Sequence, residues 1–132
     1  MPLVLMVEDD QTLLKMYQTA FEHEEFEFIS AQNGKDGIKL SLEKHPNLIL
    51  LDLLLPVMDG ISVMKELREN DWGKTVPIII LTNVDTSDQI LAAVLENEPT
   101  YYLVKANNEP SYVVEKVKEV LGEKASVNTS IV

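Results

Sequence analysis

The sequence contains no cysteine and is poor in several other kinds of residue, and each shortage excludes a class of protein. Without cysteine, the chain cannot form a disulfide framework, a thiolate metal site or a thiol nucleophile. Its 22 acidic residues outnumber 11 basic ones, and the net charge of −11 repels a nucleic-acid backbone and an anionic membrane. No apolar run approaches the roughly 18 residues of a membrane helix, and the amino terminus lacks the basic region of a signal peptide. We therefore expect a cytoplasmic protein that binds neither nucleic acid directly nor a membrane.

The chain has the composition of a globular protein, and its length of 132 residues suits one domain. Short apolar runs, typical of strands, alternate with stretches of helical periodicity. The runs cover residues 3–7, 26–31, 48–51, 76–81 and 101–104. This alternation predicts a parallel sheet with right-handed crossovers and helices on both faces. We expect one α/β domain over residues 1–122, followed by a loose polar tail over residues 123–132.

Polar residues that can carry chemistry directly follow several of these runs. They are Glu8, Asp9 and Asp10 after the first run, Asp52 after the third, Thr82 after the fourth and Lys105 after the fifth. Each one alone has an ordinary explanation as a helix cap, a loop residue or a surface residue. In an open parallel sheet, however, the carboxyl ends of the strands share one edge, where ligands bind. We therefore expect these side chains to converge on one site.

The chemistry of these residue types suggests why they would converge. Carboxylates within a few ångströms repel one another unless a cation neutralises them. Mg²⁺ prefers oxygen ligands and combines one or two carboxylates with waters and phosphate oxygens. A carboxylate beside such a metal can attack phosphorus and form an aspartyl phosphate. A lysine ammonium and a hydroxyl group can stabilise the charge on the transferring group.

Four motifs relate the chain to a known family. They are Val-Glu-Asp-Asp at 7–10, Leu-Asp-Leu-Leu-Leu-Pro-Val-Met-Asp-Gly at 51–60, Leu-Thr at 81–82 and Tyr-Tyr-Leu-Val-Lys at 101–105. With them, the chain resembles the receiver domains of two-component response regulators over residues 3–121. The resemblance implies a flavodoxin-like, doubly wound (βα)5 fold, a three-layer sandwich whose five-stranded parallel sheet has the order 2-1-3-4-5. The stretch from Asp52 through Pro56 to Asp59-Gly60 is its most specific part.

The resemblance also implies a phosphoacceptor and a metal site. In this family, the aspartate at the position of Asp52 accepts a phosphoryl group from a histidine kinase or a phosphotransfer protein. Glu8, Asp9, Asp52 and the backbone carbonyl of Leu54 are the implied ligands of Mg²⁺. Asp10 is expected to cap a helix or to support the site from behind, and not to bind the metal itself.

A switch and a set of partners follow from the same resemblance. Thr82 and Lys105 are expected to bind the phosphoryl group, and Tyr102 resembles the aromatic residue whose rotamer reports phosphorylation together with Thr82. The signal then passes to a downstream protein effector, and the chain is a monomer or a phosphorylation-dependent dimer. We expect a signalling domain and not an enzyme, since it catalyses only its own phosphorylation and dephosphorylation.

Four positions depart from the family pattern and keep two alternatives open. Ala106 follows Lys105 where the family has proline, Asn83 replaces a smaller residue, Glu98-Pro99 replaces Gly-Ala, and Leu54 replaces a polar residue or methionine. The change at Ala106 favours a pseudo-receiver, a binding module of the same fold that does not use phosphate. An aspartate-dependent phosphatase of the haloacid dehalogenase type ranks last, because Leu54 stands where that family has a second acid.

Overall fold

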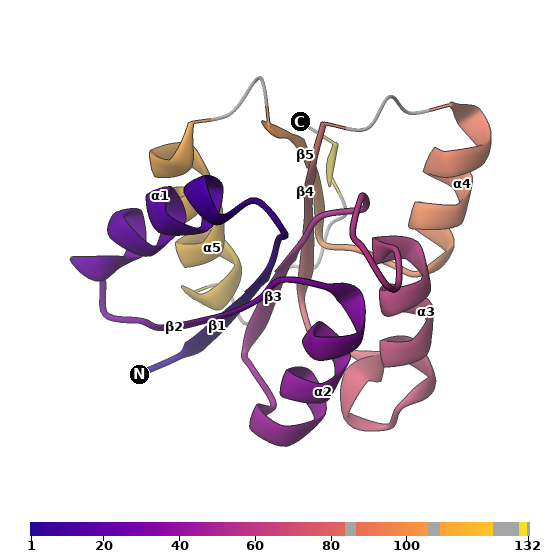
Figure 1. Ribbon diagram of the computed structural model, residues 1–132, viewed down its shortest axis with the longest axis horizontal. Coiled ribbons are helices and arrows are strands. Elements are labelled where there is room, and N and C mark those ends of the chain that lie inside the picture. The colour runs from indigo at the N-terminus through magenta and orange to yellow at the C-terminus, as the bar shows by residue number, and fades with distance from the viewer. Residues whose placement is uncertain (84–86, 106–108, 123–129, 132) are drawn as a thin grey trace.

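The computed structural model describes residues 1–83, 87–105, 109–122 and 130–131, which form strands and helices in alternation (Figure 1). In chain order the elements are β1 (Leu3–Val7), α1 (Gln11–Glu22), β2 (Glu27–Ala31), α2 (Gly34–Lys44), β3 (Leu48–Leu51), α3 (Gly60–Glu69), the 3-10 helix η1 (Trp72–Lys74), β4 (Ile78–Thr82), α4 (Asp88–Glu96), β5 (Tyr101–Val104), α5 (Pro110–Gly122) and β6 (Ser130–Ile131). Each predicted strand is present, with bounds within two residues of those expected.

All the strands are parallel and form one sheet of order β2-β1-β3-β4-β5-β6. Its first five strands have the order 2-1-3-4-5, which confirms the predicted flavodoxin-like fold. Helices α1 and α5 cover one face of the sheet, and α2, α3 and α4 cover the other (Figure 1). The three layers follow from the right-handed crossovers that parallel strands require.

The core lies on both faces of the central strands β3 and β4, which are buried along their whole length. Within β3, Ile49 and Leu51 pack on the α2–α4 side, whereas Leu48 and Leu50 pack on the α1–α5 side. A strand covered on both faces has no solvent side, so its sequence is a continuous apolar run and does not alternate. Full burial of each such side chain contributes about 1.5–3 kcal/mol to stability.

Side-chain caps set where the helices begin. The N-cap residues of α1, α2, α3 and α4 are Asp10, Asn33, Asp59 and Ser87, and each accepts a hydrogen bond from a backbone N–H in the first turn. Such a cap satisfies a donor that has no partner inside the helix. Among the described residues, no helix has both the length and the apolar character needed to cross a membrane.

Arg68 of α3 links this helix to the backbone before β4 and to the backbone at the end of α4. Its guanidinium donates to backbone carbonyls at 2.7–3.0 Å, those of Gly73, Val76, Asn97 and Glu98. Burial lowers the pKa of Arg68, and the charge of Glu98 opposes that shift. This clamp joins α3 to the turn before β5, where Glu98 has a left-handed φ of 51°. Glu98-Pro99 stands in this turn where the family pattern has Gly-Ala, and Arg68 donates to the backbone carbonyl of Glu98.

Ser130 and Ile131, which lie in the tail predicted over residues 123–132, pair with β5 as β6. The expectation rested on composition alone. Composition does not show that the outer edge of β5 offers backbone N–H and C=O groups to any extended segment nearby. Residues 123–129 and 132 lie outside the described residues.

Candidate functional site

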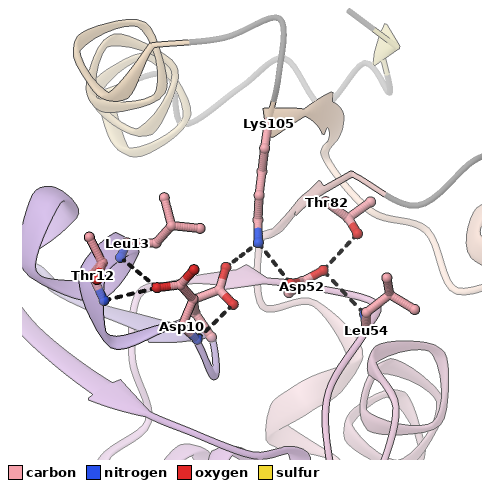
Figure 2. Close-up of polar contacts among 8 residues, drawn as sticks. Asp10, Thr12, Leu13, Asp52, Leu54, Thr82 and Lys105 are labelled. Atoms are coloured by element: carbon pink, nitrogen blue, oxygen red, sulfur yellow. Dashed lines mark hydrogen bonds and ion pairs between the residues drawn. The ribbon is translucent and has the colours of Figure 1, made fainter.

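Side chains at the ends of four different strands meet at the carboxyl edge of the sheet (Figure 2). Lys105, after β5, donates from Nζ to Asp52 Oδ2 at 2.8 Å and also to Glu8 Oε1. Thr82, at the end of β4, donates from Oγ1 to Asp52 Oδ1 at 2.6 Å. The adjacent Asp9 brings a further carboxylate to within 4.8 Å of those of Glu8 and Asp52. The structure thus brings together the site residues predicted from the strand ends.

Strand register places the two buried acids side by side. Val7 and Leu51, the last residues of β1 and β3, are partners in the parallel ladder. Glu8 directly follows Val7 and Asp52 directly follows Leu51, so both residues lie side by side at the carboxyl edge of the sheet. Adjacent parallel strands lie about 4.8 Å apart, which is close enough for both acids to share one cation.

The Asp59-Gly60 pair holds the loop after β3 against the site. Asp59 caps α3 by accepting a hydrogen bond from the N–H of Ser62 at 3.0 Å. Gly60 donates from its N–H to the carbonyl of Leu53 at 3.0 Å. A Cβ atom at position 60 would lie 2.2 Å from the carbonyl oxygen of Asp52, so a side chain there would displace the Asp52 backbone. This contact gives a physical reason for glycine in the motif.

Gly34, at the start of α2, supports the same loop from the other side. A Cβ atom there would lie 2.0 Å from the carbonyl oxygen of Met58. Its N–H donates to the carbonyl of Pro56 at 3.5 Å. The sequence gives no sign of this contact, because α2 and the loop after β3 lie far apart along the chain.

The site holds more negative charge than its cation balances. Glu8 is 1% exposed and Asp52 is 6% exposed. Burial raises the pKa of the Glu8 carboxyl to about 7; Lys105 opposes this rise and the charge of Asp52 adds to it. Burial alone would lower the pKa of Lys105, but its hydrogen bonds to Asp52 and Glu8 outweigh burial and raise it. One ammonium therefore serves two buried carboxylates, with Asp9 as a third acid beside them.

The donor set fits a hard divalent cation. Glu8, Asp9 and Asp52 offer carboxylate oxygens that all lie within 4.8 Å of one another, and Asp9 opens to solvent. Oxygen-only ligands with access to water match the preference of Mg²⁺. The N–H of Leu54 donates to Asp52 Oδ1 at 3.1 Å, so Leu54 lies beside the carboxylate. Metal binding by the Leu54 carbonyl remains a prediction.

Asp10 caps α1, which confirms the role expected for it. Its Oδ1 accepts hydrogen bonds from the N–H groups of Thr12 at 2.9 Å and Leu13 at 3.2 Å (Figure 2). Its own N–H donates to Glu8 Oε2 at 3.2 Å. Asp10 therefore faces the helix and helps to orient Glu8.

Tyr102 lies below the site and is not bonded to it. The residue is 2% exposed and packs in the core on the α2–α4 side. Within the described part of the chain, its hydroxyl has no hydrogen-bond partner. Burial raises its pKa, and the charge of Asp52 adds to the rise.

Of the four departures from the family pattern, Asn83 is exposed and Leu54 is 60% exposed, while Ala106 lies outside the described residues.

The chain is thus an open α/β domain in which a threonine and a lysine hold a buried aspartate. Comparison with known proteins agrees. The family model of the response regulator receiver domain matches residues 4–118 of this chain, and the chain therefore belongs to that family. It is 36% identical over 118 residues to the transcriptional regulatory protein SrrA of Staphylococcus aureus, covering 89% of this chain and 47% of SrrA. The chain spans about half the length of the curated relatives it matches.

Solved structures show the same architecture. A DNA-binding response regulator of the LuxR family from Staphylococcus aureus superposes with a TM-score of 0.80 at 27% identity, covering 91% of this chain and 98% of the other. The Mn²⁺-bound form of response regulator Rcp1 has a TM-score of 0.79 at 27% identity and covers 97% and 99% of the two chains. The chain is thus similar over nearly its whole length to receiver domains of response regulators.

Proposed function

We propose that Asp52 accepts a phosphoryl group from a phosphohistidine on a histidine kinase or a phosphotransfer protein. A carboxylate oxygen of Asp52 forms a bond to phosphorus, and the bond from phosphorus to the imidazole nitrogen breaks. The nitrogen keeps the electron pair. The observation that carries the proposal is the arrangement of Thr82 and Lys105, which donate to opposite oxygens of one buried carboxylate.

Thr82 and Lys105 are already in place for the charge that phosphorylation adds. The Thr82 hydroxyl and the Lys105 ammonium lie at 2.6 Å and 2.8 Å from the Asp52 oxygens. After transfer, the same two donors turn to the phosphoryl oxygens. Donors that already lie beside the reacting carboxylate can stabilise the negative charge that develops on the phosphoryl group.

We infer that Glu8, Asp9 and Asp52 hold Mg²⁺, with the Leu54 carbonyl as a further ligand. The excess of negative charge at the site supports this, since Lys105 pairs with Glu8 and Asp52, and Asp9 is a third acid beside them. When bound, the ion supplies positive charge beside the phosphoryl oxygens. The related response regulator Rcp1 has been solved in a Mn²⁺-bound form, so a divalent metal binds to that protein.

Thr82 and Tyr102 form the proposed switch. Thr82 leaves the Asp52 carboxylate for the phosphoryl group, and the buried Tyr102 lies two strand positions away across the β4–β5 ladder. Its hydroxyl, without a partner in the described structure, loses no hydrogen bond when the ring moves. The face formed by α4, β5 and α5 would then change its shape for an effector.

The effector is proposed to be reached through protein contact. Relatives such as SrrA are named as transcriptional regulators and are about twice as long as the matched region. A net charge of −11 opposes DNA binding by this chain itself. The output therefore passes to another protein or to another domain, with this chain as a monomer or a phosphorylation-dependent dimer. Its cytoplasmic location stays a prediction.

Incubation with acetyl phosphate and Mg²⁺, followed by intact mass, tests the function. Wild-type protein should gain one phosphoryl group, and the gain should disappear with EDTA or in Asp52→Asn. No gain in wild-type protein would favour the pseudo-receiver, a binding module that does not use phosphate. An undiminished gain in Asp52→Asn would show that another residue is the acceptor.

A further inference from the structure

A two-residue strand covers the outer edge of β5. Ser130 and Ile131 pair in parallel with Tyr101 and Tyr102, which makes β6 the last strand of the sheet (Figure 1). Helix α5 ends at Gly122, and a crossover helix returns the chain to the side of the sheet where parallel strands begin. The segment after α5 therefore starts on the correct side to add one more parallel strand.

Without β6, β5 would be an edge strand that attracts other strands. Residues 101–104 read Tyr-Tyr-Leu-Val and include no proline and no charged residue of the kind that protects sheet edges. Tyr101, Tyr102 and Leu103 are all buried. Within the described residues this cover is two residues long, and short strands open before the longer strands of a sheet. This cover can therefore open while the rest of the sheet stays folded.

β5 also connects this cover with the phosphoacceptor site. Tyr102 pairs with Ile131 on its outer side and with Ile80 of β4 on its inner side. Three residues after Tyr102, Lys105 donates to Asp52 and Glu8. The same short strand is thus bonded to the acids at its end and to β6 near its beginning.

We propose that the outer edge of β5 is a strand-binding surface that the chain's own Ser130–Ile131 segment closes, and that phosphorylation of Asp52 opens it. The closure stands on the pairing alone, whereas its link to Asp52 rests on the proposed function. A phosphoryl group draws Lys105 and Thr82 away from the carboxylate oxygens and shifts the end of β5. A two-residue ladder follows such a shift less well than the longer ladder between β4 and β5, so β6 detaches first. The opened edge is of the kind to which extended segments of partner proteins add.

Amide exchange measured by NMR on the full chain tests the closure. Ile131→Pro removes the backbone N–H at position 131, and Ile131→Thr is the matched control because it keeps both the N–H and a β-branched side chain. We expect amides of β5 to exchange up to roughly tenfold faster in Ile131→Pro than in wild type or Ile131→Thr. Unchanged exchange would overturn the closure. Protection in Ile131→Pro that is lost on dilution would also overturn it, because a second copy would then be the occupant.

Beryllofluoride with Mg²⁺, a mimic of the acyl phosphate, tests the link. It should shift the amide signals around Asp52 and accelerate exchange at Tyr101 and Tyr102 in wild-type protein. Because coupling is reciprocal, Ile131→Pro should tighten beryllofluoride binding by the same factor as beryllofluoride loosens β6. Shifts around Asp52 with unchanged exchange on β5 would overturn the link and leave the proposed function intact. An absence of any shift around Asp52 would overturn both, and the exchange data on Ile131→Pro would still decide the closure.

Discussion

In the loop that follows Asp52, the backbone of Val57 is strained. Its φ is 72°, a region that β-branched residues avoid, and its side chain is 75% exposed. The N–H of Met58 donates to the carbonyl of Pro56 at 2.8 Å, so the turn closes over a single residue. Strain of this kind costs about 1–3 kcal/mol, and little burial offsets it here.

Replacing Val57 with glycine should therefore stabilise the protein. We predict that Val57→Gly raises the free energy of unfolding by about 1 kcal/mol, after allowing for the extra freedom of glycine in the unfolded chain. Urea denaturation measures the change. Val57→Ala is the control, since alanine keeps the Cβ atom in the left-handed region and should gain much less. A glycine variant no more stable than the alanine variant would show that the turn is not strained.

Lys105 is, within the part of the chain that the structure describes, the ammonium that contacts both buried acids. We predict that Lys105→Met lowers the free energy of unfolding by about 3–5 kcal/mol without metal, because it leaves buried carboxylates without a partner. Saturating Mg²⁺ should recover part of the loss. Lys74→Met is the control, because its ion pair with Asp71 is exposed and contributes little. An equal loss with and without Mg²⁺ would argue against a metal beside these acids.

Helix α3 contacts the site through its first residue, Gly60. A Cβ atom at position 60 would lie 2.2 Å from the carbonyl oxygen of Asp52, so the structure has no room for a side chain there. Gly60→Ala should therefore lower both the melting temperature and the rate of phosphorylation by acetyl phosphate, because α3 and the Asp52 backbone must move apart. Gly122→Ala is the matched control, since a Cβ atom there meets nothing within 4 Å. Normal phosphorylation in a stably folded Gly60→Ala protein would contradict this role of the contact.

The strands and helices could be predicted from the sequence because each signal is local. The run Leu48–Leu51 is apolar on both faces, and Asp59, the N-cap of α3, is a residue type that favours this position. Helix α4 begins after its N-cap residue, Ser87. Contacts between distant segments carry no such local signal. For that reason the sequence revealed neither the Arg68 clamp nor the pairing of β6 with β5.

The convergence of the acids, Thr82 and Lys105 could be predicted because parallel topology brings strand ends to one edge. Their bonding pattern could not, because it depends on register and rotamer. The sequence does not show that Lys105 bridges Glu8 and Asp52. It also does not reveal which face Tyr102 occupies, since β5 is buried on both faces.

For the whole molecule, the charge of −11 makes divalent cations a strong test. We predict that Mg²⁺ raises the melting temperature, because a ligand that binds only the folded state stabilises it by mass action. Sodium chloride at matched ionic strength is the control for general screening. Asp9→Asn should raise the melting temperature in EDTA, by relieving repulsion, and should weaken the response to Mg²⁺. Equal effects of Mg²⁺ and sodium chloride would contradict a specific site.

The position of the phosphoryl group in phosphorylated protein shows whether Asp52 is the phosphoacceptor. After treatment with acetyl phosphate and Mg²⁺, borohydride reduces an acyl phosphate to the alcohol and leaves homoserine in place of the phosphorylated aspartate. Peptide mass spectrometry then reads its position. The geometry of Thr82 and Lys105 around one carboxylate predicts homoserine at position 52, and none there when EDTA is present during phosphorylation. Homoserine at position 9, or an unmodified Asp52 in protein that has gained a phosphoryl group, would contradict the account.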